Sequence, residues 1–439
     1  MTTTTTTTKN SASRRILYGL FSVICLFAGG SAFGQEAATA AAIEAAAGKG
    51  DTAWMLTSTA LVLFMTIPGL ALFYAGLVNK KNVLSVLMHC FALACALSIT
   101  WLVLGYSVAV GSEGGWSGGF GNVFHKNVDD ILGSAFQMTF FIITPALIVG
   151  TFVERIKFSA MLLFSILWAL LVYAPICHIT WFGGEGADQS LFTKWGVEDL
   201  AGGIVVHITA GVAALVACIM VGPRKNPTPP HNLPMTLTGT SMLWVGWFGF
   251  NAGSQGEASS AAAMTLFVTH ISASAAALTW MVIEWVTLKK PSALGIATGA
   301  IAGLAAITPA SGVAGPVGAL IIGISSGVVC WWASVRLKNK LGYDDSLDVV
   351  GVHGVGGFVG TVLAAVVGTA AFGGLATYSM GKQLGIQLGA SAITAIYTAV
   401  VTIAILVLVK NLCKGLRVSE DDERIGLDQS SHGEAGYNE

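Results

Sequence analysis

Long apolar runs separated by short polar breaks fill most of this chain. From Thr52 onward, runs of about 20 residues recur, and each is long enough to cross a ~30 Å hydrocarbon core as a helix. We place eleven of them, at 52–77, 84–110, 133–153, 158–180, 200–221, 235–253, 259–287, 292–309, 313–335, 348–372 and 386–410. The pattern predicts an all-α, polytopic membrane protein whose transmembrane domain covers 52–412.

The N-terminal segment has a different pattern. Two arginines close a polar start, an apolar run follows to Gly30, and small residues flank Phe33. A basic start, a short apolar stretch and a small-x-small site are typical of a secretory signal. We therefore expect a cleaved signal peptide over 1–34 and a linker over 35–51. A first true transmembrane span is the competing interpretation.

Basic residues test the count of spans, because cytoplasmic loops hold an excess of Lys and Arg. The odd-numbered predicted loops contain Lys80, Lys81, Arg155, Lys157, Arg224, Lys225, Lys289, Lys290, Arg336, Lys338 and Lys340. The even-numbered loops contain only Lys126, Lys194 and Lys382. This alternation predicts that the mature N-terminus lies outside and the C-terminus inside. Eleven spans divide as five, five and one, so the second five would be an inverted repeat of the first, with the substrate path near the midplane.

Composition agrees with lipid as the main solvent. Hydrophobic residues make up 54% of the chain and charged residues 10%, against roughly 25% charged in an ordinary soluble domain. The mean hydropathy is +0.73. A net charge of −1 argues against a nucleic-acid partner. The 54 glycines suit close packing between membrane helices.

Two histidines stand at equivalent places in the two predicted halves. Asp199 and His207 open the fifth span, and Asp348 and His353 open the tenth. Ionisable groups at membrane depth are expensive, so they indicate a substrate or proton pathway. Burial favours neutral imidazoles, each with one donor and one acceptor nitrogen, which could line a slot and pass a proton between them. The alternatives are a metal site, for which no third ligand is evident, and plain hydrogen bonding between helices.

Aromatic residues gather at the predicted outer ends of the spans. The set, with one hydroxyl, is Phe136, Phe140, Trp181, Phe250 and Ser254. Aromatic girdles are common at membrane interfaces, but together these residues predict an outer vestibule for a small cation. Asp199 is either a helix cap or a source of negative potential for that cation, and it can be both.

Three other ionisable residues lie inside predicted spans, His89, His270 and Glu284. The sequence indicates no residue that would pair with any of them, so we expect them to have structural roles.

Three motifs carry a resemblance to a known family. They are Asp199-Leu-Ala-Gly-Gly-Ile-Val-Val-His207, Gly246-Trp-Phe-Gly-Phe-Asn-Ala-Gly-Ser254 and Asp348-Val-Val-Gly-Val-His353-Gly. With these motifs the chain resembles the ammonium transporters of the Amt/Mep/Rh superfamily, and the bacterial branch more than the Rh branch. The resemblance covers nearly all of the mature chain.

The resemblance implies a role for each candidate residue. His207 and His353 correspond to the family's twin pore histidines, and Phe140 and Phe250 to its stacked phenyl gate. The outer recruitment site corresponds to Phe136, Trp181 and Ser254, and Asp199 to the acid that favours the cation without contact.

The resemblance also implies an activity and partners. We expect a transporter of ammonium, with methylammonium as a further candidate, in the bacterial plasma membrane. It would be no enzyme and would need no cofactor or metal. A homotrimer is implied, and residues 413–439 would form a cytoplasmic regulatory tail that helps to dock a PII-type signal protein. An ammonium sensor with little flux is the alternative function, and a membrane metalloenzyme is disfavoured by the missing ligand clusters.

Overall fold

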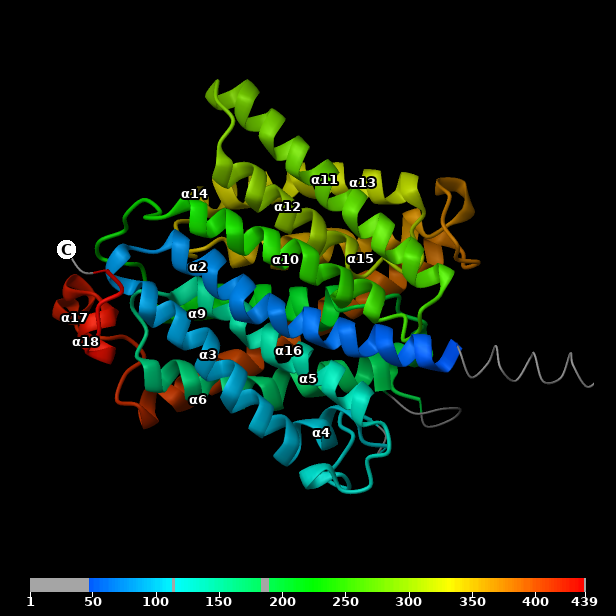
Figure 1. Cartoon of the computed structure of the whole chain (residues 1–439), viewed down its shortest axis with the longest axis horizontal. Helices are drawn as coiled ribbons and strands as arrows, with labels where there is room; N and C mark the ends of the chain where they lie inside the picture. Colours follow the sequence, from blue (N-terminus) through cyan, green and yellow to red (C-terminus); the bar gives the residue numbers. More distant parts are fainter. Residues whose placement is uncertain (1–46, 113–114, 183–188, 438–439) are drawn as a thin grey trace, which may run out of the picture. The chain divides into compact units, whose positions relative to one another are not determined.

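The computed structural model describes residues 47–112, 115–182 and 189–437 (Figure 1). The chain divides into two units, 1–53 and 54–439, and the site described below lies in the second. The predicted signal peptide lies outside the described residues, as does most of the predicted linker. The described part of that linker, residues 47–51, is helical.

Helices occupy the positions of all eleven predicted spans. Nine helices in the described ranges are long and apolar enough to cross a membrane, namely Ala47–Leu77, Lys80–Val110, Ile131–Phe152, Phe158–Phe182, Gly203–Val221, Ser260–Leu288, Pro316–Leu341, Val350–Val367 and Met380–Leu412. Leu233–Gly253 (α10) has 21 residues but is less apolar, and Ala293–Ile307 (α12) has 15. The all-α, multi-pass membrane fold is confirmed. The count of eleven, the inverted repeat and the orientation stay predictions.

Several of these helices are built from shorter α-helical pieces. The α-helices are α2 (Ala71–Leu77), α3 (Val83–Thr100), α4 (Tyr106–Val110), α5 (Ile131–Phe152), α6 (Phe158–Trp168), α7 (Ala174–Cys177), α8 (Leu191–Trp195), α9 (Thr209–Val221), α10, α11 (Ser260–Leu288), α12, α13 (Pro316–Trp331), α14 (Lys338–Leu341), α15 (Val355–Val367), α16 (Met380–Leu412), α17 (Glu420–Ile425) and α18 (Leu427–His432). Wider π-helical turns interrupt the spans, and such turns are frequent at functional sites. Two of them, Gly203–Ile208 (η8) and Val350–Gly354 (η10), carry the two histidines.

Glycines let the two histidine-bearing spans cross at close range. Gly211 of α9 lies against Gly354, so that a Cβ built on Gly354 would stand 3.1 Å from the Gly211 Cα. A Cβ built on Gly357 would stand 2.7 Å from the His207 Cβ. Only residues without a side chain permit this approach, as in other membrane helix crossings. The crossing fixes how near the two histidines can come.

Ion pairs join several basic loops at one end of the bundle. Arg224 pairs with Asp344 at 2.8 Å and with Glu154 at 3.1 Å. Arg155 is fully buried, and its Nη2 donates to the Asp344 carbonyl at 2.6 Å. The loops after the third, fifth and ninth predicted spans therefore meet at the same end.

The C-terminal tail packs against this same end, where α17 and α18 are drawn red in Figure 1. The Leu427 amide donates to Asn82 at 2.8 Å, and the Ser85 amide donates to the Asp428 carboxylate at 2.7 Å. Leu427 and Asp428 are buried. The mixed charges of the tail sequence favour a solvated segment. That expectation is wrong for this part of the tail, because its few apolar groups and one carboxylate find partners on the bundle.

Candidate functional site

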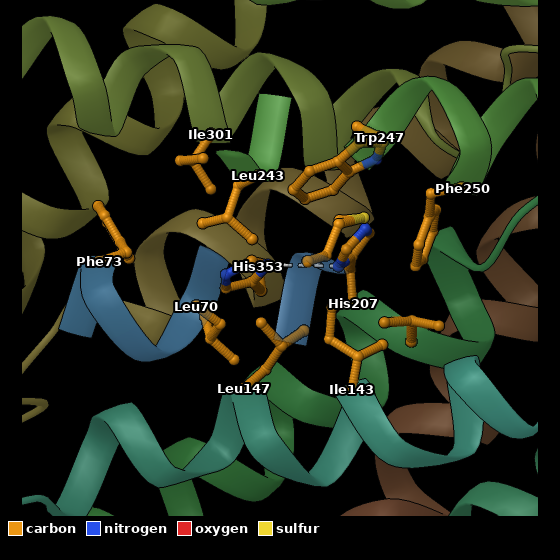
Figure 2. Close-up of a pocket in the computed structure, with 12 residues that line it drawn as sticks. Leu70, Phe73, Ile143, Leu147, His207, Leu243, Trp247, Phe250, Ile301 and His353 are labelled. Carbon is orange, nitrogen blue, oxygen red and sulfur yellow. Dashed lines mark hydrogen bonds between the residues drawn. The ribbon is translucent and has the colours of Figure 1, made fainter. Parts of the chain in front are cut away.

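The two histidines meet in the middle of the bundle (Figure 2). His207 and His353 approach through their Nδ1 atoms at 3.3 Å, and their rings are stacked with centroids 5.2 Å apart. Both side chains are buried. A hydrogen bond between two Nδ1 atoms needs one protonated and one free nitrogen, so the two neutral rings must be in different tautomers.

A narrow apolar slot runs past these rings. Its volume is about 10 Å³, close to the smallest space that admits one water molecule. Apart from the imidazoles, its walls are hydrocarbon and aromatic: Met65, Leu70, Phe73, Ile143, Leu147, Val206, Leu243, Trp247, Phe250 and Ile301. Figure 2 labels all of these except Met65 and Val206 around the histidine pair. The His207 Nε2 has no hydrogen-bond partner among the described residues. The slot therefore offers polar contacts to a small molecule only at the histidines.

The Asp199 carboxylate holds the start of the His207 helix. Its Oδ1 accepts the amides of Gly202 and Gly203 at 2.9 and 2.6 Å. Its Oδ2 accepts those of Ile204 and Val205 at 2.9 and 3.2 Å. A carboxylate with four helix amides satisfies the orphan donors of the first turn. The capping interpretation of Asp199 thus describes its contacts.

The matching residue in the other half is Asp345. Its Oδ2 accepts the Val350 amide at 2.8 Å, whereas Asp348 forms an ion pair with Lys338 at 2.5 Å. The sequence pairing of Asp348 with Asp199 is therefore wrong. A signal was available, because Asp345 precedes His353 by eight residues, the same spacing as between Asp199 and His207.

Two phenylalanines close one end of the slot. The rings of Phe140 and Phe250 lie 4.3 Å apart. Phe250 also stacks on His207 at 6.2 Å, and Phe140 contacts Phe136 at 5.0 Å. The pair stands between the histidines and a wider cavity.

That wider cavity has a volume of about 340 Å³. It is named the outer vestibule because the orientation predicted from the loop charges places it outside. Phe136, Trp181 and Ser254 lie on its wall, as the sequence grouping anticipated. The Trp181 Nε1 donates to the Asp199 carbonyl at 2.7 Å, which fixes the indole. Ser254 donates its own proton to the Phe250 carbonyl at 2.8 Å, so its lone pairs stay free for a donor.

A second cavity of about 190 Å³, the inner vestibule, lies beyond the histidines. It shares Phe73, Ile301 and His353 with the slot and opens toward Arg224 and Asp348. The cavities and the slot thus form one line through the bundle, with the Phe140 and Phe250 rings and the histidines in between.

The three ionisable residues for which the sequence predicted structural roles do not line the slot or either cavity. His89 stacks on Phe158, His270 packs on Trp244, and Glu284 accepts the Trp280 indole and the Ser292 amide. Within the described ranges, no three His, Cys, Asp or Glu side chains gather as a metal site would require.

Comparison with known proteins decides the family. The model of the Ammonium Transporter Family matches residues 53–437. An ammonium transporter of Aquifex aeolicus is 44% identical over 411 residues, which cover 90% of this chain and 95% of that protein. One of Bacillus subtilis is 42% identical, with 88% and 98% covered. The chain belongs to the ammonium transporter family.

Solved structures share the fold of this ammonium transporter family member. A structure titled "Sensor Amt Protein" has a TM-score of 0.82 at 28% identity, covering 87% of this chain and 97% of that one. Candida albicans Mep2 has a TM-score of 0.78 at 33% identity, with 85% and 87% covered. The named relatives are transporters rather than enzymes, so this chain is a multi-pass membrane transport protein.

Proposed function

We propose that this protein conducts ammonium nitrogen across the plasma membrane of a bacterium as neutral ammonia, with the proton carried separately by His207 and His353. The observation that carries the proposal is the 3.3 Å contact between their Nδ1 atoms in an apolar slot with a cavity at each end. Ammonium and the related methylammonium are the proposed substrates, in keeping with the names of the relatives.

Recruitment takes place in the outer vestibule. The aromatic faces of Phe136 and Trp181 attract a small cation through their π electrons. The free lone pairs of Ser254 accept one N–H of ammonium. Asp199 is buried, and its backbone carbonyl accepts the Trp181 indole hydrogen, so its carboxylate adds negative potential without touching the substrate. A hydrated cation would therefore exchange water for π faces and one hydroxyl.

The paired rings of Phe140 and Phe250 act as the gate where ammonium loses its proton. Transfer of an intact ion into a hydrocarbon-lined slot costs on the order of tens of kcal/mol. Ammonia carries no charge and avoids this cost. Potassium has no proton to lose, so the same slot excludes it.

The histidine pair passes the proton. If one Nδ1 carries the hydrogen, the Nε2 of that ring is free to accept a proton from the outer side. Transfer across the Nδ1 contact then makes the other ring an imidazolium, whose Nε2 hydrogen can be given up at the inner side. A tautomer change in each ring, by a ring flip or by proton exchange with a small molecule in the slot, then resets the pair.

The test is the current that an ammonium pulse produces in proteoliposomes. We expect His207→Ala and His353→Ala to lose the current while remaining folded. His270→Ala is the matched control, because His270 lies on α11 away from the slot, and it should keep the current. Ammonium-selective current at the wild-type level in both pore variants would contradict the relay.

A sensor with little flux is the second candidate. It is favoured by the likeness to the structure titled "Sensor Amt Protein". The two functions separate in a flux measurement, because a transporter accumulates labelled methylammonium in liposomes at many molecules per protein, whereas a sensor binds about one.

We further propose a homotrimer with a signal peptide over 1–34 and a cytoplasmic tail over 413–439. The packing of α18 on the Asn82 to Ser85 segment supports a tail that reports on the bundle to a PII-type partner. Mass measurement of the purified complex tests the trimer, and N-terminal sequencing tests the cleavage.

A further inference from the structure

A chain of hydrogen bonds lies behind one wall of the outer vestibule. The indole Nε1 of Trp101 donates to the Ser134 hydroxyl at 3.1 Å. The same hydroxyl lies 2.6 Å from His125 Nε2. On the other side of the imidazole, Nδ1 lies 3.4 Å from the Leu102 carbonyl. Four residues from three segments are thus linked in one line.

Donor and acceptor chemistry decides which group donates in each of these hydrogen bonds. An indole N–H can only donate and a carbonyl can only accept. Ser134 therefore accepts from Trp101 and gives its single proton to His125 Nε2, while the His125 hydrogen sits on Nδ1 and points to Leu102. Ser134 keeps one lone pair. With His125 neutral, the hydroxyl can only accept from any further partner.

That further partner has access from the vestibule. Ser134 is buried but lies on the vestibule wall, beside Tyr106 and Asp130. The His125 ring packs on Tyr106 with centroids 4.6 Å apart. His125 has a φ of +56°, a backbone conformation unfavourable for a residue with a Cβ, so its place is held by these contacts.

We propose that Ser134 is a second ammonium-accepting hydroxyl of the vestibule, and that His125 is a positioning residue that sets this acceptor role according to the external pH. The inference rests on the proposed function. Ammonium has only N–H donors, so it matches a hydroxyl whose own proton is already committed. Ser254 is in the same state, because it gives its proton to the Phe250 carbonyl and keeps lone pairs for a donor. Ser134 would thus be the matching acceptor on this wall.

Protonation of His125 reverses the arrangement. Both ring nitrogens then carry hydrogen, and Nε2–H takes the remaining lone pair of Ser134. The serine proton has to turn away from His125, so the hydroxyl meets ammonium with a donor instead of an acceptor. The new positive charge repels the cation as well.

Other charged and titratable groups lie near His125 in the chain or pack on its ring. On its own loop they are Lys126, Asp129 and Asp130, and from α4 the Tyr106 phenol faces it. The carboxylates offset part of the added charge, so a moderate effect is expected. Trp101, Leu102 and Ser134 do not titrate in this range.

The experiment is uptake of labelled methylammonium by cells, because methylammonium stays a cation over the range used. KM and Vmax are measured at external pH values between about 7.5 and 5.5. In the wild type we expect KM to rise roughly two- to fivefold on acidification with Vmax little changed, the size expected for one charge near a wet cation site.

Variants distinguish the pH response of His125 from the acceptor role of Ser134. His125→Gln stays neutral and should show no acid rise in KM. Ser134→Ala should have a raised KM at the higher pH and a smaller rise on acidification than the wild type, because only the charge of His125 then acts on the substrate. Ser134→Thr keeps the hydroxyl and should keep the full response. His231→Gln is the matched control, because His231 lies at the tail end against Tyr437, and it should behave as the wild type.

A full acid rise in KM in His125→Gln would overturn the inference, and so would a wild-type KM in Ser134→Ala at both pH values. If His125→Gln does not reach the membrane, the contrast between Ser134→Ala and Ser134→Thr decides. Absence of saturable uptake in the wild type would instead contradict the proposed function.

Discussion

Removing the carboxylate of Asp199 should strongly destabilise the start of the His207 helix, because this one side chain accepts four backbone amides there. Asp199→Ala leaves the amides of residues 202–205 without the acceptor that now serves all four. Asp199→Asn keeps one carbonyl oxygen, which can serve two of them. The variants therefore differ in how many buried donors lose their partner.

The contacts set the size of the effect. A hydrogen bond to a charged group contributes about 1.5–3 kcal/mol, and bonds to one carboxylate are not additive. We expect Asp199→Asn to lower the free energy of unfolding by about 2–3 kcal/mol and Asp199→Ala by about 4–6 kcal/mol. A typical protein has about 5–15 kcal/mol in total, so the alanine variant should be barely stable.

Thermal unfolding of the purified proteins in detergent tests whether stability falls from the wild type to Asp199→Asn to Asp199→Ala. Methylammonium uptake is measured for the same three proteins. Glu198→Ala is the matched control, since the neighbouring carboxylate accepts none of these helix amides within the described residues. If Asp199→Ala unfolded within about 1 kcal/mol of the wild type, the four bonds would not hold the helix, and the reasoning would fail.

Three further predictions follow from other contacts. Gly211→Ala places a methyl group against the Gly354 backbone, so the helices should separate, with loss of uptake and about 1–3 kcal/mol of stability in thermal unfolding. Burial raises the pKa of Asp344, but its bonds to Arg224 outweigh this and leave the pKa below the usual 3.8. This stabilisation is present above the unfolded pKa and is lost as the pH falls through the lower folded value, so Arg224→Gln should unfold at a higher pH in an acid titration than the wild type. Asp428→Ala loses the Ser85 amide bond of about 1.5–3 kcal/mol, and limited trypsin digestion should cut the tail faster; an unchanged rate would contradict the docking.

The sequence identified most of the side chains at the site but not how they meet. Of the eight candidate residues, six line the slot or the outer vestibule, Phe140 packs between Phe136 and Phe250, and Asp199 caps the helix that carries His207. The sequence did not reveal Asp345, because Asp348 lies closer to His353 and was matched with Asp199 of the first half. The role of His125 was invisible, since its partners Trp101 and Ser134 come from other segments and only the fold brings them together.

The C-terminal tail is a second segment whose contacts could not be predicted from its own sequence. Its mixed charges predicted a solvated segment, because local composition reports only the average preference of a stretch for water. Burial of Leu427 and Asp428 depends on the Asn82 side-chain oxygen, which accepts the Leu427 amide, and on the Ser85 amide, which donates to Asp428; both lie more than 300 residues away in the chain.

The amino-acid sequence alone determined the solvent of this protein, the approximate ends of its helices and the chemical types at its site, because a hydrocarbon environment imposes length and apolarity on each segment locally. Only the tertiary structure decided that two imidazoles 146 residues apart meet nitrogen to nitrogen. That distance depends on glycine contacts between α9 and η10 and on π-helical turns that rotate the side chains, and neither can be derived from the periodicity of one segment.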